Sequence, residues 1–231
     1  MSAGRPPAAT PPLALRPAPQ DAEWAAGWWH ERHAKKRRAA RRSKARLLFL
    51  GDSITENLEG GLGRRVMRRY YRSRRPFNLG FAGDRTEQVL WRLSHGAVDD
   101  LRPEVVVLLI GTNNTGHRMD AAADTAAGIA RIVDELHARL PESQVLLLGL
   151  LPREATAEDP LRRRNEAINA RIATLPGVTF LDVGARFVRA DGSLREDLLP
   201  DGLHLDEEGY RVLAEAMEPT LARLLGDRER A

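Results

Sequence analysis

The chain is 231 residues long, 42% of them hydrophobic, and it contains no cysteine. This length and apolar content suit one domain with a well-packed core, and the lack of cysteine excludes disulfides, thiolate metal sites and a thiol nucleophile. The formal net charge of +4 is uneven, because nine Lys and Arg residues with no acid among them lie within residues 32–46. We therefore expect the basicity to be a local feature of the N-terminal region.

Two N-terminal segments differ in composition from the rest of the chain. Residues 1–20 are rich in Pro and Ala, which predicts a disordered leader. Residues 21–45 predict a basic helix, with Trp24, Trp28 and Trp29 supplying the side that docks on the domain. No nucleic-acid-binding fold surrounds the basic run, so we interpret it as a solvated helix face and expect no nucleic-acid partner.

Residues 46–226 are predicted to form one domain in which strands and helices alternate. Apolar runs predict five buried strands, at residues 46–50, 77–80, 105–110, 145–150 and 178–181. Apolar residues at helical spacing predict helices at residues 56–71, 86–94, 121–140, 161–175 and 206–225. This alternation predicts a three-layer α/β/α sandwich with a mostly parallel sheet of about five strands joined by right-handed crossovers.

The longest apolar runs are as long as strands and far shorter than a membrane span. The N-terminus lacks the basic start and uninterrupted apolar core of a secretory signal. We therefore expect no membrane span and a cytoplasmic location.

Chemically useful residues follow three of the predicted strands. Ser53, Gly83 and Asn113 come after the first, second and third strand. The carboxyl ends of parallel strands share one edge of the sheet, where open α/β folds bind ligands. Asp201 and His204, three positions apart, precede the last helix. At that spacing a carboxylate can accept a hydrogen bond from one imidazole nitrogen while the other nitrogen faces a serine, as acyl transfer requires.

Four short blocks in this order resemble the GDSL/SGNH esterase superfamily: Gly51-Asp52-Ser53, Gly80-Phe81-Ala82-Gly83-Asp84, Gly111-Thr112-Asn113-Asn114 and Asp201-Gly202-Leu203-His204. The resemblance covers about residues 47–225. Around these blocks the chain is similar to the catalytic subunits of intracellular platelet-activating-factor acetylhydrolase and their bacterial relatives. The long basic segment and the Pro/Ala leader lie outside the resemblance.

The resemblance implies a flavodoxin-like sandwich that hydrolyses a small acyl ester without a metal or another cofactor. It implies Ser53 as nucleophile, His204 as general base and then acid, and Asp201 as the residue that orients the histidine. The backbone N–H groups of Ser53 and Gly83 and the side-chain amide of Asn113 would form the oxyanion hole. It also raises the expectation of a homodimer.

Several alternatives remain open from the sequence. Ser53 alone would fit a helix N-cap, and Asp182, after the last predicted strand, is an alternative partner for His204. His117 lies near the Asn113 loop and is a candidate for the pocket lining. No Gly-x-Ser-x-Gly elbow is present, so the ordinary α/β-hydrolase fold is not indicated.

The acyl group and the reaction class also have alternatives. No long insertion separates the predicted strands, which suits a short acyl group such as acetyl and leaves the alcohol half of the substrate undetermined. A carbohydrate O-deacetylase or an acyltransferase would use the same residues. A non-catalytic binding protein with a basic arm is a third hypothesis. A protein that serves only as a scaffold has no need of all four blocks.

Overall fold

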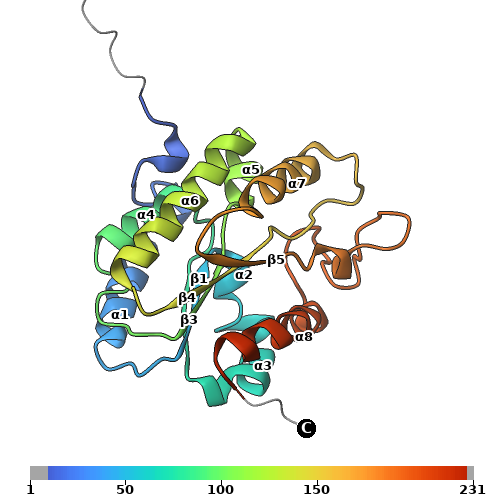
Figure 1. The fold of residues 1–231 in the computed structure, drawn as a ribbon. Coiled ribbons are helices and arrows are strands. Elements are labelled where there is room, and N and C mark those ends of the chain that lie inside the picture. The colour runs from blue at the N-terminus through green and yellow to red at the C-terminus, as the bar shows by residue number, and fades with distance from the viewer. Residues whose placement is uncertain (1–9, 228–231) are drawn as a thin grey trace, which may run out of the picture.

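The computed structural model describes residues 10–227. Its centre is a fully parallel sheet in the order β2-β1-β3-β4-β5 (Figure 1), with strands β1 (Leu47–Gly51), β2 (Pro76–Gly80), β3 (Val105–Leu109), β4 (Gln144–Leu148) and β5 (Val178–Leu181). All five strands lie within two residues of their predicted bounds, and the strand order is the flavodoxin-like one. The predicted fold class is therefore confirmed.

Successive strand residues point to opposite faces of the sheet, so the strands contribute to two cores. One core packs Leu48, Leu50 and Val106 against helices α1 (Trp29–Ala40), α4 (Thr86–Ser94), α6 (Ala122–Arg139) and α7 (Pro160–Ile172). The other packs Leu47 and Phe49 against α2 (Ser53–Glu56), α3 (Arg64–Val66) and α8 (Glu207–Leu224). Figure 1 shows α4 and α6 on one side of the sheet and α3 and α8 on the other, so the fold has three layers.

The predicted helix over residues 56–71 is wrong. The chain instead forms α2, a 3-10 turn at Gly61–Gly63, the single turn of α3, a π-helical turn at Met67–Tyr71 and a 3-10 turn at Arg72–Arg74. Gly61 has a φ of +49°, which favours glycine. A Cβ on Gly63 would lie 2.8 Å from the carbonyl oxygen of Asn57. The glycines thus allow a tight turn where apolar spacing alone indicated a continuous helix.

Residues 10–20 differ from the expected disordered leader, of which residues 1–9 lie outside the described residues. A 3-10 turn forms at Leu13–Leu15, and Ala14 is buried. The hydroxyl of Thr86 donates to the carbonyl oxygen of Ala14 over 2.8 Å, and the Ala18 N–H donates to the carbonyl oxygen of Glu87 over 3.2 Å. The segment is held through its backbone, which composition does not reveal.

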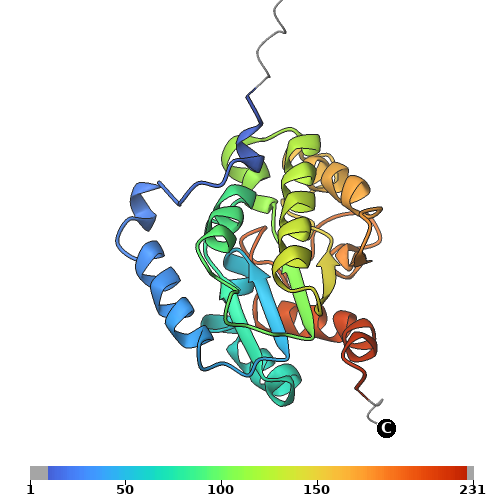
Figure 2. The ribbon, with the colours of Figure 1, turned by 60° about the vertical axis from the view of Figure 1, so that its left-hand side comes forward.

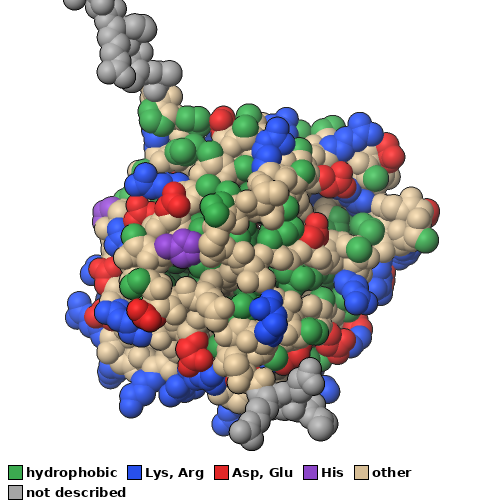
Figure 3. Space-filling view, viewed as in Figure 1, with side chains coloured by type: hydrophobic (Ala, Val, Ile, Leu, Met, Phe, Trp, Pro, Cys, Tyr) green, Lys and Arg blue, Asp and Glu red, His purple; other side chains and the backbone are tan. Residues whose placement is uncertain are grey.

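The basic helix is present but shorter than the predicted segment 21–45, since α1 begins only at Trp29 and ends at Ala40. Lys and Arg side chains lie around α1 at the lower left of the space-filling view (Figure 3). Two of them point inward: Arg32 donates to the Gly80 carbonyl oxygen over 2.9 Å, and Lys36 pairs with Glu59 over 2.5 Å. Part of the basic run therefore holds α1 on its own domain, while Lys35 and Arg38 are exposed.

Two further features bear on the site. Helix α5 (Thr112–Arg118), absent from the sequence prediction, begins one residue after Gly111 at the carboxyl end of β3. In the order β2-β1-β3-β4-β5, β1 leads to β2 on one side of it and β3 leads to β4 on the other side. The strand order therefore reverses between β1 and β3, which is the kind of topological switch point where open α/β sheets bind ligands. Among residues 10–227, no helix is both long and apolar enough to cross a membrane.

Candidate active site

Ser53 is the first residue of α2, directly after β1. Asp52 caps this helix, because its Oδ1 accepts a hydrogen bond from the Ile54 N–H over 3.0 Å. A Cβ on Gly51 would lie 2.2 Å from the Leu109 carbonyl oxygen, so glycine is required for the close approach of β1 and β3 there. On α8, the hydroxyl of Tyr210 donates to the Ile54 carbonyl oxygen over 2.8 Å. These contacts fix Ser53 at the carboxyl edge of the sheet.

A chain of hydrogen bonds leads from Ser53 to the segment before α8. The Ser53 Oγ lies 2.9 Å from His204 Nε2, and His204 Nδ1 lies 2.7 Å from Asp201 Oδ2. The other carboxylate oxygen accepts from the backbone N–H groups of Leu203 (3.0 Å) and His204 (2.6 Å). With a proton on Nδ1 bound to this carboxylate, Nε2 is free to accept the serine proton.

The electrostatics of Asp201 agree with this arrangement. Partial burial acts to raise the pKa of its carboxyl, but hydrogen bonds from the backbone and ring of His204 outweigh it and hold the pKa below its usual value. Asp182, the alternative orienter, instead accepts from the Gly184 N–H over 2.8 Å. The structure thus brings Asp201, and not Asp182, to His204.

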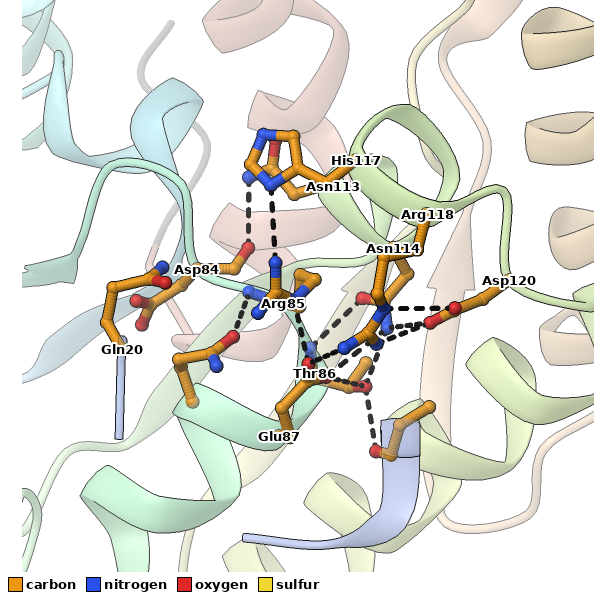
Figure 4. Close-up of polar contacts among 12 residues, drawn as sticks. Gln20, Asp84, Arg85, Thr86, Glu87, Asn113, Asn114, His117, Arg118 and Asp120 are labelled. Atoms are coloured by element: carbon orange, nitrogen blue, oxygen red, sulfur yellow. Dashed lines mark hydrogen bonds and ion pairs between the residues drawn. The ribbon is translucent and has the colours of Figure 1, made fainter. Parts of the chain in front are cut away.

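The two other predicted oxyanion donors lie in neighbouring loops. Gly83, between β2 and α4, has a φ of +72°. Among residues 10–227, no backbone carbonyl oxygen accepts a hydrogen bond from the Gly83 N–H. Asn113 lies in the first turn of α5 and is buried. Its amide donates to the Asp84 carbonyl oxygen over 2.9 Å (Figure 4), which fixes the amide beside the Gly83 loop.

A buried ion pair between Asp84 and Arg92 supports this loop, and the sequence did not indicate the role of Arg92 or the hydrogen bond from Trp29. The Asp84 carboxylate accepts from Trp29 Nε1 over 2.7 Å and from Arg92 Nε over 2.8 Å. Arg92 also donates to the carbonyl oxygens of Leu79 (3.1 Å) and Gly51 (3.3 Å), at the ends of β2 and β1. Burial raises the pKa of Asp84 to about 6, against the opposing effect of Arg92. The sequence feature that could have indicated this buried role is the position of Arg92 among the inward-facing apolar residues of α4.

Asp52 is a second buried carboxyl next to the nucleophile. Its Oδ2 has no hydrogen-bond partner in the part of the chain that the structure describes. Burial raises its pKa to about 7, with a further contribution from nearby Asp84 and an opposing one from the Ile54 N–H. Near neutral pH the native protein therefore holds a large fraction of this carboxyl in its uncharged form.

The surface beside Asn113, formed by Arg85, His117 and Arg118, carries positive charge. Arg85 and Arg118 both bind the buried carboxylate of Glu87, over 2.7 and 2.6 Å, and Arg85 points toward His117 of α5 (Figure 4). The His117 Nδ1 lies 3.5 Å from Arg85 Nη1. Burial lowers the pKa of His117, and the neighbouring arginines lower it further, which favours the neutral imidazole. Within the described residues 10–227, no cluster of three His, Asp or Glu side chains could hold a metal ion.

A parallel α/β sandwich with a serine, a histidine and an asparagine at its topological switch point has the architecture of an ester hydrolase. Residues 49–212 match the model of the GDSL-like lipase/acylhydrolase family. The chain belongs to this family and is a hydrolase that acts on esters.

Curated relatives support the assignment. Platelet-activating factor acetylhydrolase IB subunit alpha1 of Homo sapiens is 33% identical over 216 residues, which cover 92% of this chain and 90% of the relative. The alpha2 subunit of Gallus gallus is 34% identical over 183 residues, which cover 78% of this chain and 77% of the relative.

Solved structures share the fold. A crystal structure of a putative acylhydrolase from Bacteroides fragilis matches with a TM-score of 0.71 and 23% identity, covering 89% of this chain and all of the other. A catalytic mutant of an acetylxylan esterase from Geobacillus stearothermophilus matches with a TM-score of 0.63 and 21% identity, covering 81% of this chain and 98% of the other.

Proposed function

We propose that the protein is a serine esterase that releases a small acyl group, with acetyl as the preferred one. Ser53 is the nucleophile, His204 the general base and then acid, and Asp201 the residue that orients His204. The observation that carries this proposal is the continuous chain from Ser53 Oγ through the imidazole to Asp201 Oδ2, with links of 2.9 and 2.7 Å.

In the first half of the reaction, Ser53 Oγ attacks the ester carbonyl carbon and its proton passes to His204 Nε2. The carbonyl oxygen becomes an oxyanion that accepts hydrogen bonds from the N–H groups of Ser53 and Gly83 and from the Asn113 amide. The tetrahedral intermediate then collapses and expels the alcohol, which takes the proton from His204. In the second half, water attacks the acyl-serine with His204 again as base, which releases the acid and restores Ser53.

The acetyl preference has two supports. The proteins that this chain resembles include an acetylhydrolase and an acetylxylan esterase. The sequence also carries no long insertion between its strands that would cover an extended acyl chain.

A carbohydrate O-deacetylase or acyltransferase is the second candidate. It is favoured by the acetylxylan esterase among the structures that share the fold, whose catalytic mutants replace a serine, an aspartate and a histidine. These are the residue types that Ser53, Asp201 and His204 supply here. The third reading, a binding protein with a basic arm, is disfavoured because Arg32 and Lys36 are engaged within the domain.

The test is hydrolysis of p-nitrophenyl esters from acetate to octanoate, without added metal, by wild type and the Ser53→Ala variant. We expect acetate to be the fastest substrate and the variant to lose about 10⁵-fold or more in kcat. Ser94→Ala, which alters an exposed hydroxyl at the end of α4, is the matched control and should keep wild-type activity. A Ser53→Ala variant as active as wild type would refute the proposal.

The resemblance to the acetylhydrolase subunits also supports a homodimer in the cytoplasm. Sedimentation equilibrium of the full chain tests the dimer, and a mass of one chain at micromolar concentration would exclude it. Cell fractionation tests the location.

A further inference from the structure

Trp24 is an exposed aromatic side chain that lies against the proposed oxyanion loop. It belongs to a 3-10 turn at Glu23–Ala25, and 53% of it is exposed. A Cβ on Gly83 would lie 2.2 Å from Cη2 and 2.6 Å from Cζ2 of Trp24. The six-membered ring of the indole therefore rests directly on the Cα of Gly83.

The position of Trp24 is fixed by contacts on both sides of it in the chain. The buried Gln20 side chain donates to the Gly83 carbonyl oxygen over 3.1 Å. Trp28 Nε1 donates to the Trp24 carbonyl oxygen over 3.2 Å, and the two indole rings lie 6.1 Å apart at an angle of 31°. Trp29 follows, anchored on Asp84. The exposed ring is thus held in place by its neighbours.

Two features indicate that the contact of Trp24 with Gly83 does more than stabilise the fold. An indole packed for stability alone is normally mostly buried, as Trp29 is, whereas half of Trp24 remains open to solvent. The residue also lies outside the segment 49–212 that the family model matches, and outside the four blocks that supply the proposed catalytic residues. Exposed indole faces bind flat, apolar faces of ligands.

The geometry indicates which part of the substrate the ring meets. If the ester carbonyl lies at the Gly83 N–H and the acyl group is small, as the proposed function has it, the alcohol half is the part of the substrate that reaches the half-exposed indole beside Gly83. Arg85, two positions after Gly83, and His117 supply polar groups on the Asn113 side of this loop (Figure 4). An apolar face beside hydrogen-bonding groups suits a ring that carries hydroxyls.

We propose that Trp24 is a specificity residue whose exposed face packs against a ring in the alcohol half of the ester. This inference rests on the proposed function, because it takes Gly83 as an oxyanion donor. It assigns the N-terminal segment a part in substrate choice.

The experiment compares kcat/KM for acetate esters that share the acyl group and differ in the alcohol: ethyl acetate, cyclohexyl acetate and an acetylated methyl xylopyranoside. We expect Trp24→Ala to lower kcat/KM about tenfold for the two ring alcohols and less than twofold for ethyl acetate. Trp24→Phe should recover part of the loss. Leu13→Ala, another exposed apolar residue of the same segment, is the control and should leave all three values unchanged.

Three results would overturn the inference. One is an equal loss for all three esters, which would make Trp24 a support of the loop. The second is no loss for any ester. The third is a change in sedimentation mass on Trp24→Ala with a uniform fall in activity, which would place the indole in an interface between copies of the chain.

Failure of the proposed function gives a different result. If wild type hydrolyses no acetate ester, or Ser53→Ala remains active, the esterase mechanism fails. The ring contact is then measured without turnover, by tryptophan fluorescence during titration with methyl xylopyranoside. Quenching in wild type that disappears in Trp24→Ala supports the contact, and equal quenching in both proteins contradicts it.

Discussion

The two sides of the candidate site differ in how deeply they are buried. On the nucleophile side, the side chains of His204 and Asp201 are 35% and 56% exposed. On the oxyanion side, Asp84 and Arg92 are fully buried, and Asn113 is only 4% exposed. Asp201 and His204 are held by a few local contacts near the surface. The Asp84–Arg92 pair is held by contacts with four separate parts of the chain, at Trp29, Gly51, Leu79 and Asn113.

This difference matches the tasks proposed for the two sides. In the proposed cycle His204 gives a proton to the departing alcohol and later takes one from the attacking water, so its imidazole must lie within reach of both. A short loop with its own hydrogen bonds can hold it there. Oxyanion donors work by being fixed before charge develops, so any freedom lost beforehand lowers the barrier. We therefore expect variants on the nucleophile side to change chemistry with little change in stability, and variants around Asp84 to change both.

The largest effect in this comparison is expected for Asp201→Asn. The asparagine amide favours the wrong imidazole tautomer, so kcat should fall by up to about 10⁴-fold with little change in KM. The free energy of unfolding should change by less than about 1 kcal/mol because the residue is more than half exposed. Asp182→Asn is the control, and a larger loss of kcat there would reverse the assignment of the two aspartates.

The next effect is expected for Asn113→Ala, which removes one proposed oxyanion donor. We expect kcat to fall by about 10²- to 10³-fold, because the donor acts mainly on charge in the transition state. Steady-state kinetics on p-nitrophenyl acetate measures it. A variant that raised KM and kept kcat would show that Asn113 only binds substrate.

Trp29→Phe tests the support of the oxyanion loop. It leaves the buried Asp84 carboxylate without its indole donor, which should cost about 1.5–3 kcal/mol of unfolding free energy. We expect a fall in kcat of several-fold, much less than for Asn113→Ala. Trp28→Phe, whose indole N–H bonds at the surface, is the matched control for urea unfolding and should stay close to wild type. Equal free energies of unfolding for the two variants would mean that the hydrogen bond from Trp29 to Asp84 does not stabilise the native state.

Asp52→Asn should change catalysis least and alter the pH dependence of stability instead. The native carboxyl has a pKa of about 7, and that of an unfolded chain is about 3.9. Between these values the native state binds a proton that the unfolded state releases, so stability is lost as pH rises from 4 to 7. The difference corresponds to about 4 kcal/mol at most.

The asparagine side chain does not titrate, so Asp52→Asn lacks this loss of stability with rising pH. Its side-chain carbonyl oxygen can still accept a hydrogen bond from the Ile54 N–H. We expect urea unfolding at pH 5 and pH 8 to show a smaller drop for Asp52→Asn than for wild type. Asp84, whose pKa is also raised, remains in both proteins, so the difference between the two drops reports Asp52 together with its electrostatic coupling to Asp84. Identical drops would mean that Asp52 is ionised across this range in the native state.

The sequence allowed the sheet and the residues at its carboxyl edge to be predicted, because both depend on local patterns. Unbroken apolar runs such as residues 105–110 marked strands buried on both faces. Asp201 and His204 are only three positions apart, so their contact follows from a short loop. The catalytic roles of these residues stay predictions until the variants are measured.

Other parts of the site depend on contacts between distant segments, which single-sequence patterns do not encode. Trp29 meets Asp84 across 55 positions, and its role could not be read from the basic helix around it. The order of residues 10–20 escaped prediction for the same reason. Helix α5 was missed because its residues are polar and show no apolar period.

Helix α1 also solves a problem that every open sheet has. Strand β2 lies at an edge of the sheet and would otherwise offer unpaired carbonyl and N–H groups as a template for a second chain. The strand begins with Pro76, which has no N–H, and Arg32 of α1 donates to the carbonyl oxygen of Gly80 at its other end. In Figure 2, α1 runs alongside this edge. With proline at one end of β2 and Arg32 on the carbonyl oxygen at the other, this edge offers fewer free backbone groups for a second chain to pair with.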